Sequence, residues 1–96
     1  ERNMKSHFFS LIMAICFGIY FSISKFEWLW ILLAITLVLS MEIINTVMEN
    51  VVDYVSLEYN NDAKKIKDMS AAAVLIVSLF AAVVGAIIFL PKIFNF

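Results

Sequence analysis

Three apolar stretches, separated by short polar segments, predict three membrane-spanning helices. The first stretch, residues 8–24, carries no formal charge. It can cross the hydrocarbon of a bilayer if its polar flanks continue the helix, which predicts a helix over about residues 6–24. Residues 25–27 form a connection typical of a tight turn between antiparallel helices. The expected fold class is all-α and integral to a membrane, with a single domain over residues 1–96.

The second helix is predicted over about residues 28–58. Trp28, at its start, is a residue type that favours the headgroup level of a bilayer. The chain stays apolar to Met41 and then continues without Gly or Pro, in a pattern that still favours a helix. This pattern indicates one long helix that leaves the membrane on its far side.

The third helix is predicted over about residues 62–90. A polar segment, residues 60–67, precedes the uncharged stretch 71–90, and Pro91 is expected to end the helix. Small residues recur four positions apart in it, a spacing that lets helices approach closely in lipid. These are Ser78 with Ala82, and Ala81 with Gly85. The alternative is that small residues are simply common in membrane helices.

The basic residues are unevenly distributed around the three helices. Five of them precede the first helix or separate the second from the third: Arg2, Lys5, Lys64, Lys65 and Lys67. Lys25 and Lys92 fall on the other side. The positive-inside bias therefore places the N-terminus in the cytoplasm. A cleaved signal peptide over residues 1–24 is the alternative, but no A-x-A-like cleavage site follows the apolar run.

Composition supports the membrane assignment and excludes several classes of protein. Hydrophobic residues make up 64% of the chain and charged residues 16%, which a small soluble domain could not keep off its surface. The formal net charge is -1, so there is no basic field to bind nucleic acid. One Cys and one His rule out an internal disulfide and a Cys/His zinc site.

Polar residues on the second predicted helix share one face. At about 100° per residue, they fall within an arc of roughly 80°: Glu42, Asn45, Glu49 and Asp53. If Trp28 marks the outer interface, Glu42 lies about 21 Å further along, inside the hydrocarbon, and Glu49 about 31 Å, near the cytoplasmic boundary. An acid at such depth costs about 2.5 to 3.5 kcal/mol and usually marks a functional site. The alternative is a hydrogen bond to a neighbouring helix.

These acids suit the chemistry of a magnesium–nucleotide complex. Mg²⁺ accepts one or two carboxylates while phosphates supply the rest of its shell. Lys67 and Asp68 return the chain to the same membrane face, where an ammonium group could meet phosphate oxygens. Ordinary basic flanking of a membrane helix is the alternative for these lysines. Phosphoryl transfer needs little more than positioning, charge neutralisation and a carboxylate that accepts a proton.

Two other routes to catalysis are excluded. A P-loop or kinase glycine loop cannot be built from Gly18 and Gly85, which lie in apolar stretches. No credible nucleophile is present, because Cys16 lacks a charged neighbour in the sequence. His7 is favoured as a residue flanking the membrane rather than as a base.

Two motifs then resemble a known family. The run from Glu42 to Asp53 (E-I-I-N-T-V-M-E-N-V-V-D), followed by K-D-M-S-A-A-A-V from Lys67, resembles the signature of the prokaryotic diacylglycerol kinase family. The opening E-R-N-x-x-x-H and the closing L-P-K look more like its undecaprenol kinase branch. The resemblance covers nearly the whole chain. It implies a homotrimer of three-helix subunits in the bacterial cytoplasmic membrane, with active sites shared between subunits at the cytoplasmic interface.

The resemblance also implies roles for individual residues. Glu42 would accept the proton of the lipid hydroxyl, supported by Asn45. Glu1 and Glu49 would coordinate Mg²⁺. The residues expected to bind ATP are Glu1, Glu49, Glu58, Tyr59, Asn60, Lys67 and Asp68. Those expected at the lipid substrate are Asn3, His7, Trp28 and Glu42.

The sequence departs from the family at a few places. Asn60 stands where the family often has His, and Ile66 where an Ala commonly precedes Lys-Asp. Asn cannot carry charge, so the departure at Asn60 bears on nucleotide affinity or its pH dependence. The amphipathic surface helix that normally precedes the Glu1 position does not stand in this sequence.

Three functions follow as hypotheses. The leading one is transfer of the γ-phosphate of ATP to undecaprenol, and the first alternative is transfer to diacylglycerol. The choice of lipid is expected to lie in a groove between the first and second helices, with aromatic walls from Phe8, Phe9, Phe17 and Trp28. An alternative of another class is a small transporter whose membrane acid carries protons or cations. Mg²⁺-dependent nucleotide binding separates the classes.

Overall fold

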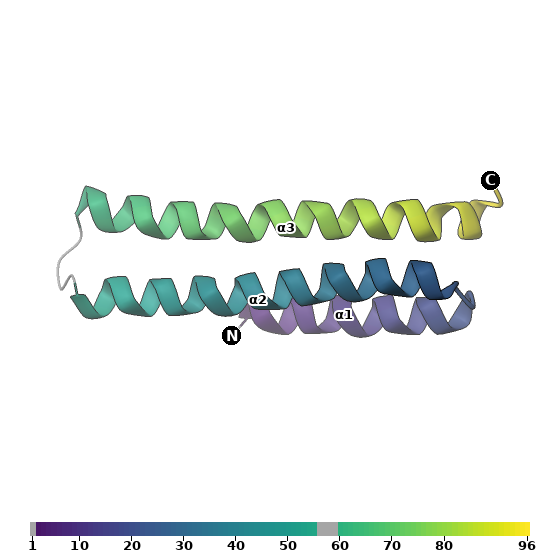
Figure 1. Ribbon diagram of the computed structural model, residues 1–96. Coiled ribbons are helices and arrows are strands. Elements are labelled where there is room, and N and C mark those ends of the chain that lie inside the picture. Colours follow the sequence, from purple (N-terminus) through teal and green to yellow (C-terminus); the bar gives the residue numbers. More distant parts are fainter. Residues whose placement is uncertain (1, 56–59) are drawn as a thin grey trace.

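Two long antiparallel helices form the body of the protein, and a shorter helix lies against one of them (Figure 1). The computed structural model describes residues 2–55 and 60–96, with side chains from residue 5 onward. The helices are α1 (Arg2–Tyr20), α2 (Lys25–Val55) and α3 (Asn61–Phe94). Helix α1 runs beside the half of α2 that begins at Lys25, whereas α3 accompanies α2 along its length (Figure 1). The predicted all-α class is confirmed.

The two ends of the molecule differ, and we name them by their connections. The turn end holds the connection between α1 and α2, and the loop end is where α2 reaches Val55 and α3 begins at Asn61. Helices α2 and α3 have 31 and 34 residues. At about 1.5 Å per residue they measure roughly 46 and 51 Å, which exceeds a hydrocarbon thickness of about 30 Å. One end of this pair must therefore extend beyond a bilayer.

The surfaces of these helices are those of a membrane protein. Helices α2 and α3 are long and apolar enough to cross a membrane, yet only 17% of the most apolar window of each is buried. The core helix of a soluble protein would instead be mostly covered. The apolar part of α1, Lys5–Tyr20, is a shorter apolar helix. The third membrane span therefore stays a prediction.

The turn between α1 and α2 differs from the sequence prediction. Helix α1 ends at Tyr20 rather than at 24, and α2 begins at Lys25 rather than at 28. Ser22 adopts a left-handed φ of 51°, which breaks the helix. The backbone N–H of Ser24 then donates to Oε1 of Glu27 at 2.9 Å, and the N–H of Glu27 donates to Oγ of Ser24 at 3.1 Å. This reciprocal capping box starts α2 three residues early.

The ends of α3 also have local causes. Asn60 caps its start, because Oδ1 accepts the backbone N–H of Ala63 at 2.7 Å. The predicted stop at Pro91 is wrong, since the helix continues to Phe94. Pro91 has no N–H to donate to the carbonyl of Ile87, so the helix loses one hydrogen bond there and still continues for three residues. Asn95, in the left-handed conformation at φ 60°, ends the helix and donates its N–H to the Pro91 carbonyl.

A small apolar core lies toward the turn end. Its buried members come from the turn, α2 and α3: Ile23, Ile31, Val84, Ile88 and Phe89. Trp28 packs against this cluster. A Cβ added at Gly18 would lie 2.6 Å from Cη2 of Trp28, so a glycine is needed for α1 to approach this ring. Trp28 thus helps to join α1 to α2.

One ion pair at each end ties α2 to α3. Near the turn end, Nζ of Lys92 lies 3.3 Å from Oε2 of Glu27, the same residue that caps α2. Toward the loop end, Nζ of Lys67 lies 2.5 Å from Oδ1 of Asp53. In this register of the two helices, the acidic face of α2 lies next to the lysine-bearing start of α3.

Candidate active site

Glu42 is a buried acid at the middle of α2. The residue is 5% exposed and is the only buried charged residue among the side chains that the structure describes. Its backbone carbonyl accepts the hydroxyl of Thr46 at 3.0 Å, one turn along the helix. A buried carboxylate is costly without a partner. The surroundings of its side chain therefore decide what it can do.

The partner of Glu42 comes from α1. Nδ1 of His7 lies 2.7 Å from Oε2 of Glu42. The ring N–H is not aligned with the carboxylate, so the contact has the distance of an ion pair without the direction of a hydrogen bond. The two residues are far apart in the sequence, and only the packing of α1 on α2 brings them together.

The polar face predicted on α2 becomes progressively more exposed toward the loop end. Glu42 is buried, Asn45 is half-buried, and Glu49 and Asp53 are exposed. This order follows contact with the other helices, and the membrane depths of Glu42 and Glu49 stay predictions. Oδ1 of Asn45 is buried and accepts no hydrogen bond in the part of the chain that the structure describes. Its free lone pairs can serve a substrate hydroxyl or a bound water.

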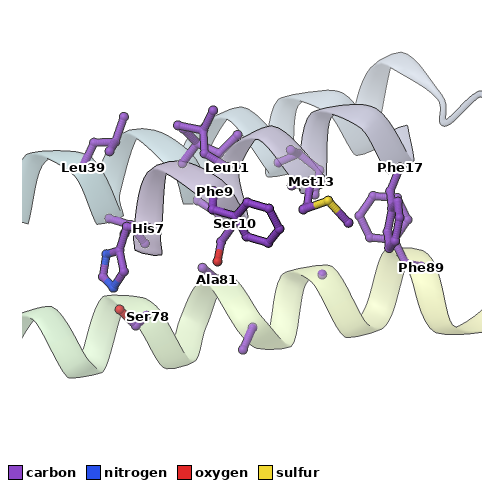
Figure 2. Close-up of a pocket in the computed structure, with 17 residues that line it drawn as sticks. His7, Phe9, Ser10, Leu11, Met13, Phe17, Leu39, Ser78, Ala81 and Phe89 are labelled. Carbon is purple, nitrogen blue, oxygen red and sulfur yellow. The ribbon is translucent and has the colours of Figure 1, made fainter. Parts of the chain in front are cut away.

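A groove of about 460 Å³ opens between α1 and α3, with α2 as its floor. Figure 2 shows His7 and Ser78 toward one end, and Phe17 and Phe89 together at the other. The rings of Phe17 and Phe89 meet edge to face, with centroids 5.9 Å apart. Apart from His7 and two serines, the lining is apolar. The groove is thus an apolar channel whose polar end holds the partner of Glu42.

The groove involves one helix more than the sequence predicted. Phe9 and Phe17 line it as expected and α2 supplies five of its lining residues, but α3 forms a further wall. Phe8 and Trp28 are not among its lining residues, and Trp28 packs instead against Gly18 and the core. The small residues noted in the third predicted helix form part of this wall. They are Ser78, Ala81, Ala82 and Gly85.

The loop end gathers charge from both long helices. Besides the pair between Asp53 and Lys67, Nζ of Lys64 lies 2.6 Å from Oδ2 of Asp68 on α3 itself. Glu49 lies close enough to Lys67 to act on it electrostatically. All these groups are on or near the surface, so the pairs are weak and open to exchange. Asp53, for which the sequence predicted no specific role, is the direct partner of Lys67.

The predicted nucleotide residues have different outcomes. Lys67 and Asp68 share the start of α3, each in an ion pair. Asn60 uses its carboxamide oxygen to cap α3. Glu58 and Tyr59 lie outside the described residues. Their roles, like that of Asn60, stay predictions.

The predicted metal and lipid residues are also only partly described. Glu1 lies outside the described residues, so its pairing with Glu49 cannot be placed. Across the described part of the chain, no group of three or more His, Cys, Asp or Glu residues is arranged to hold a metal ion. The backbone of Asn3 belongs to α1, but its side chain is not described. His7 lines the groove and meets Glu42, which joins the lipid and catalytic predictions in one place.

Comparisons with known proteins identify the family to which the chain belongs. The sequence profile of the family described as prokaryotic diacylglycerol kinase matches residues 1–89. The chain is 33% identical to undecaprenol kinase of Bacillus subtilis over 93 residues, which cover 97% of this chain and 76% of that protein. It is 31% identical to a diacylglycerol kinase of Synechocystis, covering 99% of this chain and 55% of that protein.

A third relative is more distant. The chain is 28% identical to diacylglycerol kinase of Escherichia coli over 88 residues, which cover 92% of this chain and 72% of that protein. The profile match extends across α1 and α2 and through most of α3, so it includes the buried acid, its partner and the charged loop end. The chain therefore belongs to the prokaryotic diacylglycerol kinase family, and it is a membrane lipid kinase.

Proposed function

We propose that this kinase transfers the γ-phosphate of ATP to undecaprenol and so forms undecaprenyl phosphate. The observation that carries the proposal is the buried Glu42 carboxylate, whose partner His7 lines the polar end of an apolar groove. A long-chain alcohol needs an apolar channel for its chain and a base at its hydroxyl, and the groove and Glu42 supply this combination. The alternative of a small transporter whose membrane acid carries protons or cations loses support, because the family is one of kinases.

The reaction is divided along α2 in this proposal. Glu42 accepts the proton of the lipid hydroxyl, and Asn45 offers its unpartnered carboxamide oxygen beside it. Glu49 lies about 10 Å further along the helix, a distance that a triphosphate can bridge. Lys67 exchanges Asp53 for phosphate oxygens, because an exposed ion pair gives up little on opening. The lipid is thus held within the apolar zone and the nucleotide at its edge.

Magnesium fits the donors present at the loop end. Glu49 and Asp53 offer exposed carboxylate oxygens, the hard ligands that Mg²⁺ accepts beside phosphates. We propose that Glu49 holds the ion together with Glu1. When bound, Mg²⁺ neutralises the charge that develops on the phosphates.

Undecaprenol is proposed over diacylglycerol on two grounds. The identity to an undecaprenol kinase is 33% over most of the chain, against 31% and 28% to two diacylglycerol kinases. The groove is also a single channel with few polar groups, which suits one polyprenyl chain. Diacylglycerol remains the alternative substrate, since the same residues can deprotonate its hydroxyl.

The assembly and orientation are also proposed. Large apolar side chains are exposed on all three helices, among them Phe9, Leu33 and Leu79 at 66%, 44% and 58%. We propose a homotrimer in the bacterial cytoplasmic membrane, with the N-terminus and the loop end in the cytoplasm.

Phosphate transfer to competing lipids tests the proposal. Purified protein is given ATP labelled at the γ-phosphate, Mg²⁺, and equal amounts of undecaprenol and diacylglycerol in the same mixed micelles. Labelled undecaprenyl phosphate as the main product, lost in Glu42→Gln, is the expected result. Phosphatidic acid as the main product would overturn the substrate while keeping the chemistry. No labelled lipid at all would overturn the proposed reaction.

A further inference from the structure

His7 forms the one ion-pair contact with a buried carboxylate in the described part of the chain. The side chain of Glu42 in this pair is 6% exposed, whereas the carboxylates of the other pairs are 27%, 63% and 64% exposed. Nδ1 of His7 is itself buried, although 25% of the side chain is exposed to the groove. The ring therefore meets Glu42 with one nitrogen and presents another part of its surface to the groove (Figure 2).

A carboxylate in an apolar site is costly to bury without a polar partner, so the groups around Glu42 decide how its side chain is held. On the α3 side, the groove offers Ser78 and apolar residues, and no charged group of α3 lines it. Lys64 and Lys67 lie toward the loop end and contact Asp68 and Asp53. Of the described groups, His7 is the one placed to stabilise Glu42.

We propose that His7 is a positioning residue for the kinase reaction, an inference that rests on the proposed function. Its Nδ1 lies 2.7 Å from Oε2 of Glu42 and fixes that oxygen, which leaves Oε1 to face the hydroxyl of the lipid. The N–H is not aligned with the carboxylate in this structure. Such contacts commonly tighten when substrate binds, and a rotation of the ring would align this one.

The chemical step balances without any further reactant. The O–H bond of the lipid alcohol breaks, and its proton goes to Oε1 of Glu42. The lipid oxygen forms a bond to the γ-phosphorus of ATP. The bond from that phosphorus to the bridging oxygen breaks, and ADP leaves with the electron pair. His7 takes no part in bond making, and its effect is confined to the position and direction of the Glu42 carboxylate.

Two substitutions of nearly equal shape test this role. Asn in place of His7 keeps an N–H donor near the position of Nδ1, whereas Leu has a similar outline and no donor. We expect His7→Leu to lower kcat about 10- to 100-fold with the KM for ATP and for undecaprenol unchanged, as for loss of a hydrogen bond to a charged group. His7→Asn should recover much of that loss. Ser6→Leu, at the exposed neighbouring position, is the control and should keep wild-type kcat.

The coupling to Glu42 is measured in a double variant. Because His7 acts through Glu42, His7→Leu should cause no further loss in a Glu42→Gln background. Wild-type kcat in His7→Leu, equal losses in the Leu and Asn variants, or a change confined to the KM for undecaprenol would overturn the inference. If His7→Leu does not fold, His7→Gln takes its place with the same expectation, since its donor lies away from Nδ1. Failure of the proposed function is distinct, because the wild-type protein would then label no lipid.

Discussion

Replacing Glu42 should separate activity from stability. Its side chain is buried, and no hydrogen bond from it to α2 or α3 is seen in the described part of the chain. In Glu42→Leu an apolar group of similar size replaces a buried carboxylate whose contact with His7 lacks the direction of a hydrogen bond, so the cost of burying that polar group is removed. His7 itself is partly exposed. We expect the free energy of unfolding to be unchanged or raised by about 1 to 2 kcal/mol.

The rate of phosphate transfer should fall in Glu42→Leu, although its stability does not. Loss of a general base lowers the rate by about 10²- to 10⁴-fold. The assay measures phosphate transfer to undecaprenol and, on the same preparation, unfolding in detergent micelles titrated with a denaturing detergent. Ser40→Leu, at an exposed position of α2, controls for added apolar surface. If Glu42→Leu is less stable by several kcal/mol, Glu42 is a structural contact between helices, and the separation of activity from stability is wrong.

Three further predictions concern packing and the groove. Glu27→Ala removes both the cap of α2 and the pair to Lys92, and it should lower the free energy of unfolding by about 1 to 2 kcal/mol. Glu27→Gln can keep the cap and should lose less stability, whereas equal losses of stability in the two variants would contradict this prediction. Gly18→Val should destabilise by about 1 to 3 kcal/mol and shift the fluorescence of Trp28, whereas an unchanged emission spectrum would speak against the close approach. In Gly85→Leu the new side chain projects into the open groove, so it should raise the KM for undecaprenol and leave the KM for ATP unchanged. A raised KM for ATP with an unchanged KM for undecaprenol would contradict the groove as the lipid site.

Sequence patterns predicted the order of the helices and the polar face of α2. The lengths of the apolar stretches and the spacing of Glu42, Asn45 and Glu49 are local properties, so they can be interpreted without a structure. The helix ends were less accurate. The Ser24–Glu27 capping box was present in the sequence as S-x-x-E, and attention to it would have placed the start of α2 correctly. Pro91 was given too much weight as a stop.

Contacts between helices were beyond the sequence patterns. The pairing of His7 with Glu42 depends on where α1 lies along α2, which periodicity does not determine. The part that α3 plays in the groove was missed for the same reason. Gly18 offered an indirect signal, since a glycine within an apolar helix often marks a close approach, here of Trp28. The partner of Lys67 likewise follows from the antiparallel register of α2 and α3.

The proposed function places the lipid alcohol in the groove with its hydroxyl at Glu42. Photo-crosslinking tests this placement, with a polyprenol that carries a diazirine near its hydroxyl and excess unlabelled undecaprenol as competitor. The labelled residues are identified by mass spectrometry. We expect the labelling that undecaprenol suppresses to fall on groove residues such as Phe9, Ser78 and Ala81. Competed labelling of exposed α3 positions outside the groove, such as Leu75 and Ile76, with none in the groove, would contradict it.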